Sequence, residues 1–127
     1  MDKILVVDDD RDILDVVSML LKRNNYNVMT LSRGTFISGS IQTFSPDLIL
    51  LDVALAGEDG RDICLKLKKT EETKNIPVIL FSAHYDLVNN IGECMADGLV
   101  TKPFEVPYLL ETIRKNIKGN NNVSSPT

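Results

Sequence analysis

Short runs of consecutive apolar residues alternate along this chain with segments whose apolar residues recur every three or four positions, and this alternation constrains the fold most. The clearest runs are Ile4–Val7, Leu48–Leu51 and Val78–Phe81, and the weaker ones are Val28–Leu31 and Leu99–Val100. An unbroken apolar run of about four to eight residues is typical of a strand buried on both faces. The sequence therefore predicts five short strands, most of them inside a sheet.

Between and after these runs, the apolar residues are spaced as on one face of a helix. This spacing predicts a first helix along Ile13–Leu21, which Asp10 can cap and Asp12 can favour through the helix dipole. The second, Thr35–Phe44, contains Gly39 and several serines and threonines, so we expect it to be short or frayed. Further helices are expected from Asp59 or Gly60 onward, along Leu87–Met95 and along Val106–Ile117.

Strands and helices alternate five times, which argues for an α/β domain with a parallel sheet and helices on both of its faces. A chain of 127 residues is the size of one such domain. Residues 119–127 contain three asparagines, two serines and a proline. We therefore expect the domain to cover residues 1–118 and residues 119–127 to form a flexible tail or the stub of a linker.

Charge and hydropathy exclude several classes of protein. The net charge is −4, which disfavours direct binding of nucleic acid or of an anionic membrane surface, because both need a basic face. No apolar stretch approaches the about 20 residues that span a bilayer, and no signal peptide is evident, so we expect no membrane insertion and a cytoplasmic location. We expect Cys64 and Cys94 to be reduced, partly buried thiols rather than a disulfide or a zinc site.

Acidic residues follow two of the predicted strands at their carboxyl ends. Asp8, Asp9 and Asp10 follow the first strand, and Asp52 follows Leu48–Leu51. In an open α/β sheet, ligands bind outside the carboxyl ends of the strands, where the strand order reverses. If the first and third strands are neighbours, three or four carboxylates meet at one point.

Such a cluster suits a divalent cation and phosphoryl chemistry. Crowded carboxylates do not all stay ionised at low cost, whereas Mg²⁺ takes oxygen ligands and keeps several waters. An aspartate beside that ion can act as a nucleophile and form an aspartyl phosphate. Ser82 and Lys102, which end the fourth and fifth strands, can bond and neutralise the phosphoryl oxygens. Together these groups predict phosphoryl transfer.

Each of these residues also has a simpler interpretation when it is taken alone. The acidic run could cap a helix, Asp52 could belong to a turn, Ser82 could cap a helix, and Lys102 could be a surface lysine. Their joint placement at the ends of four strands favours the functional interpretation.

Four motifs, in this order and spacing, resemble the receiver domain of the bacterial two-component response regulators. The resemblance covers about residues 2–118 and implies a flavodoxin-like (βα)5 three-layer sandwich with five parallel strands in the order 2-1-3-4-5. The matching residues are Val6–Asp9, Leu51–Val53 with Gly57, Asp59 and Gly60, Phe81–Ala83, and Thr101–Phe104.

The resemblance also implies a role for each residue at this edge of the sheet. Asp52 is the expected phosphoacceptor, and the peptide bond between Lys102 and Pro103 is often cis in this family. The expected Mg²⁺ ligands are the carboxylates of Asp8, Asp9 and Asp52 and the backbone carbonyl of Ala54, and the expected phosphoryl contacts are Ser82 and Lys102.

The protein so implied is a signalling switch and not an enzyme, although it assists its own phosphotransfer and dephosphorylation. A histidine kinase or a histidine phosphotransfer protein would donate the phosphoryl group to Asp52. A downstream protein would bind the face made by the helices along Leu87–Met95 and Val106–Ile117 and by the strand Leu99–Val100, through a shift between two conformations.

Departures from the family pattern leave other interpretations open. Leu99 stands where an aromatic residue usually turns inward, and Ala56 stands where a proline is often found. Both motivate an alternative, a protein-interaction module that binds its partner regardless of phosphate. A stand-alone phosphatase is less favoured, because Ala54 stands where such enzymes place a second acid. His84, two residues after Ser82, would either orient the attacking water or face solvent.

Overall fold

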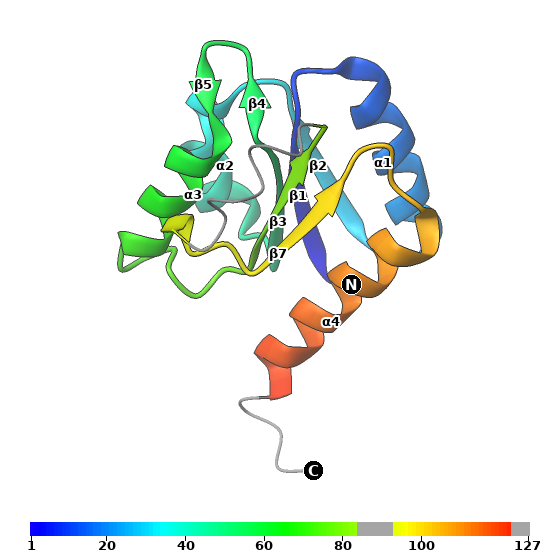
Figure 1. The fold of residues 1–127 in the computed structure, drawn as a ribbon. Helices are drawn as coiled ribbons and strands as arrows, with labels where there is room; N and C mark the ends of the chain where they lie inside the picture. Colours follow the sequence, from blue (N-terminus) through cyan, green and yellow to red (C-terminus); the bar gives the residue numbers. More distant parts are fainter. Residues whose placement is uncertain (84–92, 123–127) are drawn as a thin grey trace.

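Five parallel strands form one sheet in the computed structural model of the chain, which describes residues 1–83 and 93–122. They lie side by side in the order β2-β1-β3-β6-β7 (Figure 1). This is the predicted order 2-1-3-4-5 of five strands taken along the chain, so the predicted parallel sheet is confirmed. The strands are β1 Lys3–Val7, β2 Asn27–Leu31, β3 Leu48–Asp52, β6 Val78–Ser82 and β7 Gly98–Thr101.

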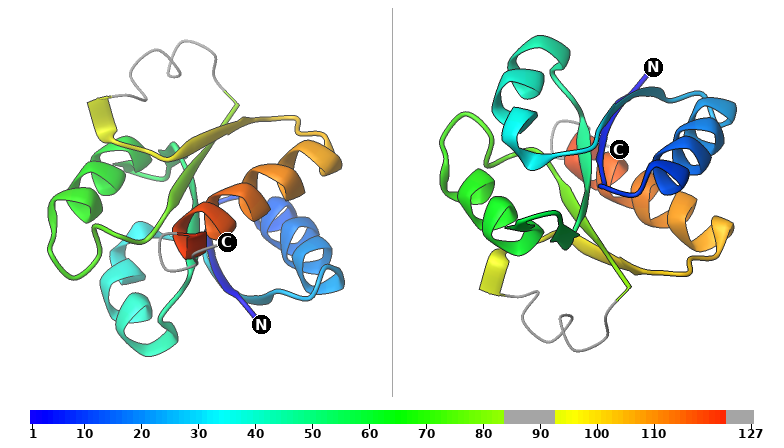
Figure 2. Two further views of the ribbon diagram at one scale, coloured as in Figure 1. Left: turned by 90° about the horizontal axis from the view of Figure 1, so that it is seen from below. Right: turned by 90° about the horizontal axis from the view of Figure 1, so that it is seen from above.

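Helices cover both faces of this sheet, which makes a three-layer arrangement. Figure 2 shows α1 and α4 together on one face and α2 and α3 on the other. Their bounds are α1 Arg11–Arg23, α2 Ile37–Phe44, α3 Gly60–Lys69 and α4 Val106–Asn122. Among the described residues, no helix is long and apolar enough to cross a bilayer.

The apolar core lies in two layers, one on each face of the sheet, because successive strand residues point to opposite faces. Ile4 and Val6 of β1 pack on the side of α1 and α4, whereas Leu5 and Val7 pack on the side of α2 and α3. All four side chains are at most 1% exposed. The unbroken apolar run of β1 therefore serves both layers, as predicted for a strand buried on two faces.

Side-chain caps fix the residues at which α1 and α3 begin. Asp10 Oδ1 accepts hydrogen bonds from the backbone N–H groups of Asp12 (2.9 Å) and Ile13 (3.3 Å), which confirms the predicted cap. Asp59 Oδ1 accepts one from the backbone N–H of Arg61 (2.9 Å), so α3 begins at Gly60. Both capping aspartates directly precede helices that start at the carboxyl-end edge of the sheet, where the acidic residues gather.

Two connections differ in detail from a plain alternation of strands and helices. The helix α2 is short, as predicted, because a 3₁₀ turn, Gly34–Phe36, precedes it and Ser45 ends it in a left-handed conformation (φ 52°). After β3 the chain makes a small antiparallel hairpin, β4 Ala54–Leu55 with β5 Glu58–Asp59. This hairpin could not be predicted from the sequence, because strands of two residues carry no periodic pattern.

Two residues predicted on the apolar stripes of the later helices, Val106 and Met95, are exposed in the structure. The buried stripe of α4 starts at Leu109, whereas Val106, its first residue, is 41% exposed. The helix also continues to Asn122, past the domain boundary expected at residue 118. Met95 was placed on the stripe of the fourth helix, but it is 51% exposed with φ 65° and lies in a turn before β7. The rest of that helix and His84 fall in residues 84–92, outside the described residues.

Candidate functional site

The hydrogen-bond ladder of the sheet continues one step past the strand ends and fixes the backbone of the predicted site. The Asp8 N–H donates to the carbonyl of Leu31 (3.1 Å), and the Lys102 N–H donates to the carbonyl of Ser82 (2.7 Å). Asp52, the last residue of β3, lies opposite Phe81 of β6. Strands far apart in the sequence therefore hold Asp8, Asp52, Ser82 and Lys102 at one edge of the sheet.

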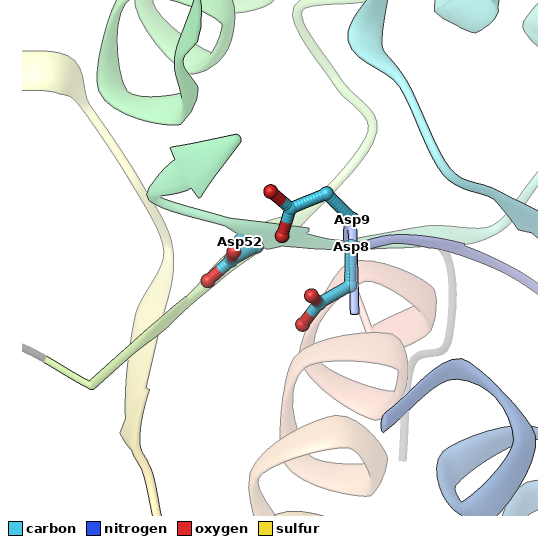
Figure 3. A group of neighbouring side chains, drawn as sticks. All are labelled: Asp8, Asp9 and Asp52. Atoms are coloured by element: carbon cyan, nitrogen blue, oxygen red, sulfur yellow. The ribbon is translucent and has the colours of Figure 1, made fainter. Parts of the chain in front are cut away.

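Three carboxylates converge at this edge. Asp8, Asp9 and Asp52 each offer an oxygen, and these oxygens lie within 4.8 Å of one another. Figure 3 shows the three carboxyl groups turned to the same side from the neighbouring ends of β1 and β3. Asp8 is fully buried and Asp52 is 4% exposed, whereas Asp9 lies at the surface. The predicted convergence is confirmed, and the cluster opens to solvent on the side of Asp9.

The ammonium of Lys102 joins two of these carboxylates. Its Nζ lies 2.7 Å from Asp8 Oδ2 and 3.1 Å from Asp52 Oδ1, and it sits 4.9 Å from the centroid of the Phe81 ring. Burial by itself lowers the pKa of Lys102, but the hydrogen bond to Asp8 and the charge of Asp52 outweigh it and raise that pKa above its usual range. Lys102 is therefore a fixed cation that bridges the carboxylate after β1 and the carboxylate at the end of β3. The peptide bond from Lys102 to Pro103 is cis, as the family resemblance implies.

A backbone N–H group two residues further along the sequence also holds the Asp8 carboxylate. Its Oδ1 accepts a hydrogen bond from the backbone N–H of Asp10 (2.9 Å), while its Oδ2 faces Lys102. A carboxylate that is fully buried needs this full set of partners, because an unpaired buried charge is very costly. Each oxygen still has a lone pair in reserve, since a carboxylate offers about four acceptor positions.

The cluster as a whole carries more negative than positive charge. Burial, and then the nearby charge of Asp8, raise the pKa of Asp52 from 3.8 to about 6, although Lys102 works in the opposite direction. One ammonium thus does not balance the three carboxylates in this part of the described chain. Oxygen-only donors with excess negative charge match a hard divalent cation such as Mg²⁺, so Asp8, Asp9 and Asp52 fit that ion.

Gly60 lets the backbone after Asp52 fold back tightly, a role that the sequence pattern does not reveal. Its N–H donates to the carbonyl of Val53 (2.7 Å), and a β-carbon at this position would lie 2.1 Å from the backbone oxygen of Asp52. No side chain fits there without a shift of the backbone that carries Asp52. A glycine at the first helical position, directly after a capping aspartate, was the available signal, but its cause is a contact with the backbone of Asp52.

The remaining predicted residues lie at the same edge. Ser82 is the last residue of β6, is 2% exposed, and pairs with Thr101 of β7. Ala54 is exposed at the start of β4, two residues beyond Asp52, and pairs with Asp59 across the hairpin. The structure thus brings all six predicted positions to the carboxyl ends of the strands, while the roles of all six in metal binding and phosphoryl transfer remain predictions.

Comparison with known proteins agrees with this fold. A model of the family described as "Response regulator receiver domain" matches residues 4–114. A CheY-like receiver domain protein from Methanospirillum hungatei is 25% identical, with a TM-score of 0.88, over 96% of this chain and 98% of that one. The receiver domain of a signal transduction histidine kinase from Syntrophus aciditrophicus is 27% identical, with a TM-score of 0.81, over 94% and 92% of the two chains.

A third similar structure is the BeF3-activated N-terminal receiver domain of RstA from Klebsiella pneumoniae. It is 27% identical, with a TM-score of 0.82, over 91% of this chain and 98% of that one. The family match covers most of the chain, and the acidic cluster lies where the motifs that suggested the family place it. The chain belongs to the response regulator receiver domains of two-component signalling.

Proposed function

We propose that this receiver domain is a phosphorylation switch that accepts a phosphoryl group on Asp52 from the phosphohistidine of a histidine kinase or of a phosphotransfer protein. The observation that carries the proposal is the contact of Lys102 with both Asp8 and Asp52 inside a cluster of three carboxylates. A purely structural ion pair needs one carboxylate for one ammonium. The surplus of acid at a solvent-facing edge favours a site that takes a cation and a charged group.

In the proposed reaction, an oxygen of the Asp52 carboxylate attacks phosphorus while the bond from phosphorus to the donor imidazole nitrogen breaks. The electron pair of that bond leaves with the imidazole, and the product is an acyl phosphate on Asp52. Lys102 remains beside Asp52 and offsets the negative charge that gathers on the phosphoryl oxygens. The hydroxyl of Ser82 would bond one of these oxygens from the neighbouring strand.

The proposed Mg²⁺ ligands are the carboxylates of Asp8, Asp9 and Asp52 and the backbone carbonyl of Ala54. Receiver domains bind Mg²⁺ at an acidic pocket, and when bound the ion supplies charge neutralisation for the phosphoryl group. Asp9 is the exposed member of the cluster, so it would exchange between water and the ion with little effect on the fold. The buried Asp8 has a second task, because it also holds Lys102.

Receiver domains act on other proteins, and we propose that this one signals through the surface of β7 and α4 from a cytoplasmic location. Tyr108 in the first turn of α4 donates a hydrogen bond from its hydroxyl to the carbonyl of Leu99 in β7 (3.3 Å). This hydrogen bond joins α4 directly to β7 at Leu99, which lies three residues before Lys102. A shift of Lys102 on phosphorylation would be passed along β7 to this surface.

A small-molecule donor tests the proposed acceptor without knowledge of the kinase. With acetyl phosphate and Mg²⁺, we expect intact-mass spectra of the wild type to gain about 80 Da, the mass of one phosphoryl group. Asp52→Asn should gain nothing, and EDTA should prevent the gain in the wild type. Asp15→Asn, which removes an exposed carboxylate of α1, is the matched control and should behave as the wild type. Labelling of Asp52→Asn, or none of any variant, contradicts the proposal.

The alternative, a protein-interaction module that ignores phosphate, is favoured by two departures from the family pattern, the aliphatic Leu99 in β7 and Ala56 in place of a proline. The two candidates differ in what beryllofluoride, a phosphoryl mimic, does to the surface of β7 and α4. The switch predicts amide chemical-shift changes at Leu99, Thr101 and Tyr108 when beryllofluoride and Mg²⁺ are added. Changes confined to the residues beside Asp52 would favour the interaction module.

A further inference from the structure

The two cysteines of the chain come together on the face of the sheet away from α1 and α4. Cys64 lies in the middle of α3 and is fully buried, and Cys94 lies shortly before β7 and is 4% exposed. Neither is in a disulfide, and both lie in the same core layer. Figures 1 and 2 both show the short turn around residue 94, in yellow, beside the green helix α3.

The contact between them is close. Cys64 donates a hydrogen bond from its Sγ to the backbone carbonyl of Cys94 at 3.3 Å. Burial, and then the adjacent thiol of Cys94, raise the pKa of the Cys64 thiol to about 12. The sulfur of Cys64 thus touches residue 94, and the Cys94 thiol is close enough to act on the Cys64 thiol. This proximity is what a disulfide between the two residues requires first.

The thiol of Cys94 borders a cavity. A pocket of about 230 Å³ is lined by Cys94 but not by Cys64, among the described residues. Its other lining residues are Asp59, Arg61, Asp62, Leu65 and Glu93. Asp59 already pairs with the guanidinium of Arg61 (2.6 Å), so the two remaining acids leave the wall negative. Such a pocket admits a small neutral molecule more readily than an anion.

We propose that Cys94 and Cys64 form a peroxide-oxidisable dithiol, in which Cys94 reacts first through the pocket and Cys64 resolves it. The Cys94 sulfur attacks one oxygen of a peroxide, the O–O bond breaks, and the products are a sulfenic acid on Cys94 and water or an alcohol. The Cys64 sulfur then displaces the sulfenic oxygen as a second water, which carries away the thiol proton of Cys64. The two thiols lose two electrons in total, and the peroxide gains them.

The order of the two steps follows from the geometry. Cys64 is protonated and enclosed, so it meets no oxidant directly, but it touches the residue that does. The resulting bond would tie α3 to the turn that enters β7. The carboxylates of Asp8, Asp9 and Asp52 are not among the described residues that line this pocket, and its chemistry does not depend on the proposed phosphorylation.

Peptide mapping of the oxidised wild type tests the pair directly. The reduced full-length chain, native and in EDTA, is treated with hydrogen peroxide, quenched with acid and digested without reductant. We expect a cross-linked peptide that joins Cys64 to Cys94, a loss of about 2 Da per chain and no covalent dimer. Oxidised glutathione is anionic and bulky, so it should oxidise the pair at least about tenfold more slowly than hydrogen peroxide does. A wild type that keeps both thiols, or that forms only intermolecular disulfides, refutes the proposal.

Two single variants test which thiol reacts first, with circular dichroism to verify that each is folded. In Cys64→Ser, dimedone should trap a sulfenic acid on Cys94 after peroxide treatment. In Cys94→Ser, Cys64 should stay reduced and should be alkylated only after denaturation. Dimedone on Cys64 in the second variant would reverse the proposed order, and if both variants misfold, the rates of the wild type with the two oxidants still decide.

Discussion

Removal of the Asp52 carboxylate is expected to stabilise the metal-free protein, although it removes the proposed phosphoacceptor. Burial and the charge of Asp8 raise the pKa of Asp52 from 3.8 to about 6. The folded state therefore holds this proton more tightly than the unfolded chain does, and the free energy of unfolding falls as the pH rises from about 4 to about 6. Above pH 6 the ionised carboxylate costs about 3 kcal/mol, at about 1.4 kcal/mol per pKa unit.

The variant Asp52→Asn replaces this carboxylate with a neutral group of the same shape. We expect it to be more stable than the wild type by about 1–3 kcal/mol at pH 7.5 in EDTA, because the amide resembles the protonated acid. At pH 4.5 Asp52 is protonated in the folded wild type, so the difference should shrink to about 1 kcal/mol or less. Urea unfolding followed by far-ultraviolet circular dichroism measures both values, since the chain has no tryptophan.

Exposed carboxylates of the same chain provide the control. Asp15→Asn makes the same change of charge on the exposed part of α1 and should alter stability by about 0.5 kcal/mol or less at either pH. An Asp52→Asn protein that is no more stable than the wild type at pH 7.5, or whose advantage does not depend on pH, would refute the electrostatic reasoning.

Three further perturbations test other parts of the site. Lys102→Met leaves Asp8 buried without its cation, so we expect the free energy of unfolding to fall by about 3–5 kcal/mol in urea titrations at neutral pH, and an unchanged value would contradict the buried ion pair. Gly60→Ala places a methyl group against the backbone of Asp52 and should lower both stability and the rate of labelling by acetyl phosphate. Gly39→Ala in α2, which has open space around it, should instead raise stability by about 0.5–1 kcal/mol, and equal effects of the two alanines would argue against the close contact. Mg²⁺ at about 100 times its dissociation constant should stabilise the wild type by about 2.7 kcal/mol, EDTA should reverse this, and a full response in Asp9→Asn would exclude Asp9 as a ligand.

The convergence of the acids could be predicted because it depends only on the strand pattern. Once Ile4–Val7 and Leu48–Leu51 are recognised as neighbouring buried strands, Asp8 and Asp52 must emerge at the same edge. The cap at Asp10 and the start of α3 after Asp59 were also predictable, because a capping aspartate acts on the backbone of its own next turn. These features are local, or follow from the direction of parallel strands.

Other features of the site depend on contacts that the sequence does not reveal. Asp8 and Asp9 look alike in the sequence, yet the sheet buries Asp8 against Lys102 and leaves Asp9 at the surface. The need for Gly60 arises from the path of the backbone after Asp52, 8 residues earlier in the numbering of the chain. The approach of Lys102 to the ring of Phe81 likewise requires that β6 and β7 be neighbours.

The helices show the same division between pattern and tertiary structure. The stripe of α4 was predicted from its period, but its continuation to Asn122 was not, since Gly119–Asn122 adds no apolar position. Once a helix is formed, each further residue gains a backbone hydrogen bond that offsets the entropy of fixing it, whatever that residue contributes to the core. Met95 fits a helical spacing in the sequence but takes φ 65° where the chain turns into β7.

A crystal structure grown with Mg²⁺ and beryllofluoride tests the central claim most directly, because it locates the cation and the phosphoryl mimic together. We predict beryllium bonded to an Asp52 carboxylate oxygen, Mg²⁺ held by the carboxylates of Asp8, Asp9 and Asp52 and by the Ala54 carbonyl, and Lys102 against a fluoride. Beryllofluoride on another residue, or Mg²⁺ outside this cluster with Lys102 still bound to both carboxylates, would contradict the account.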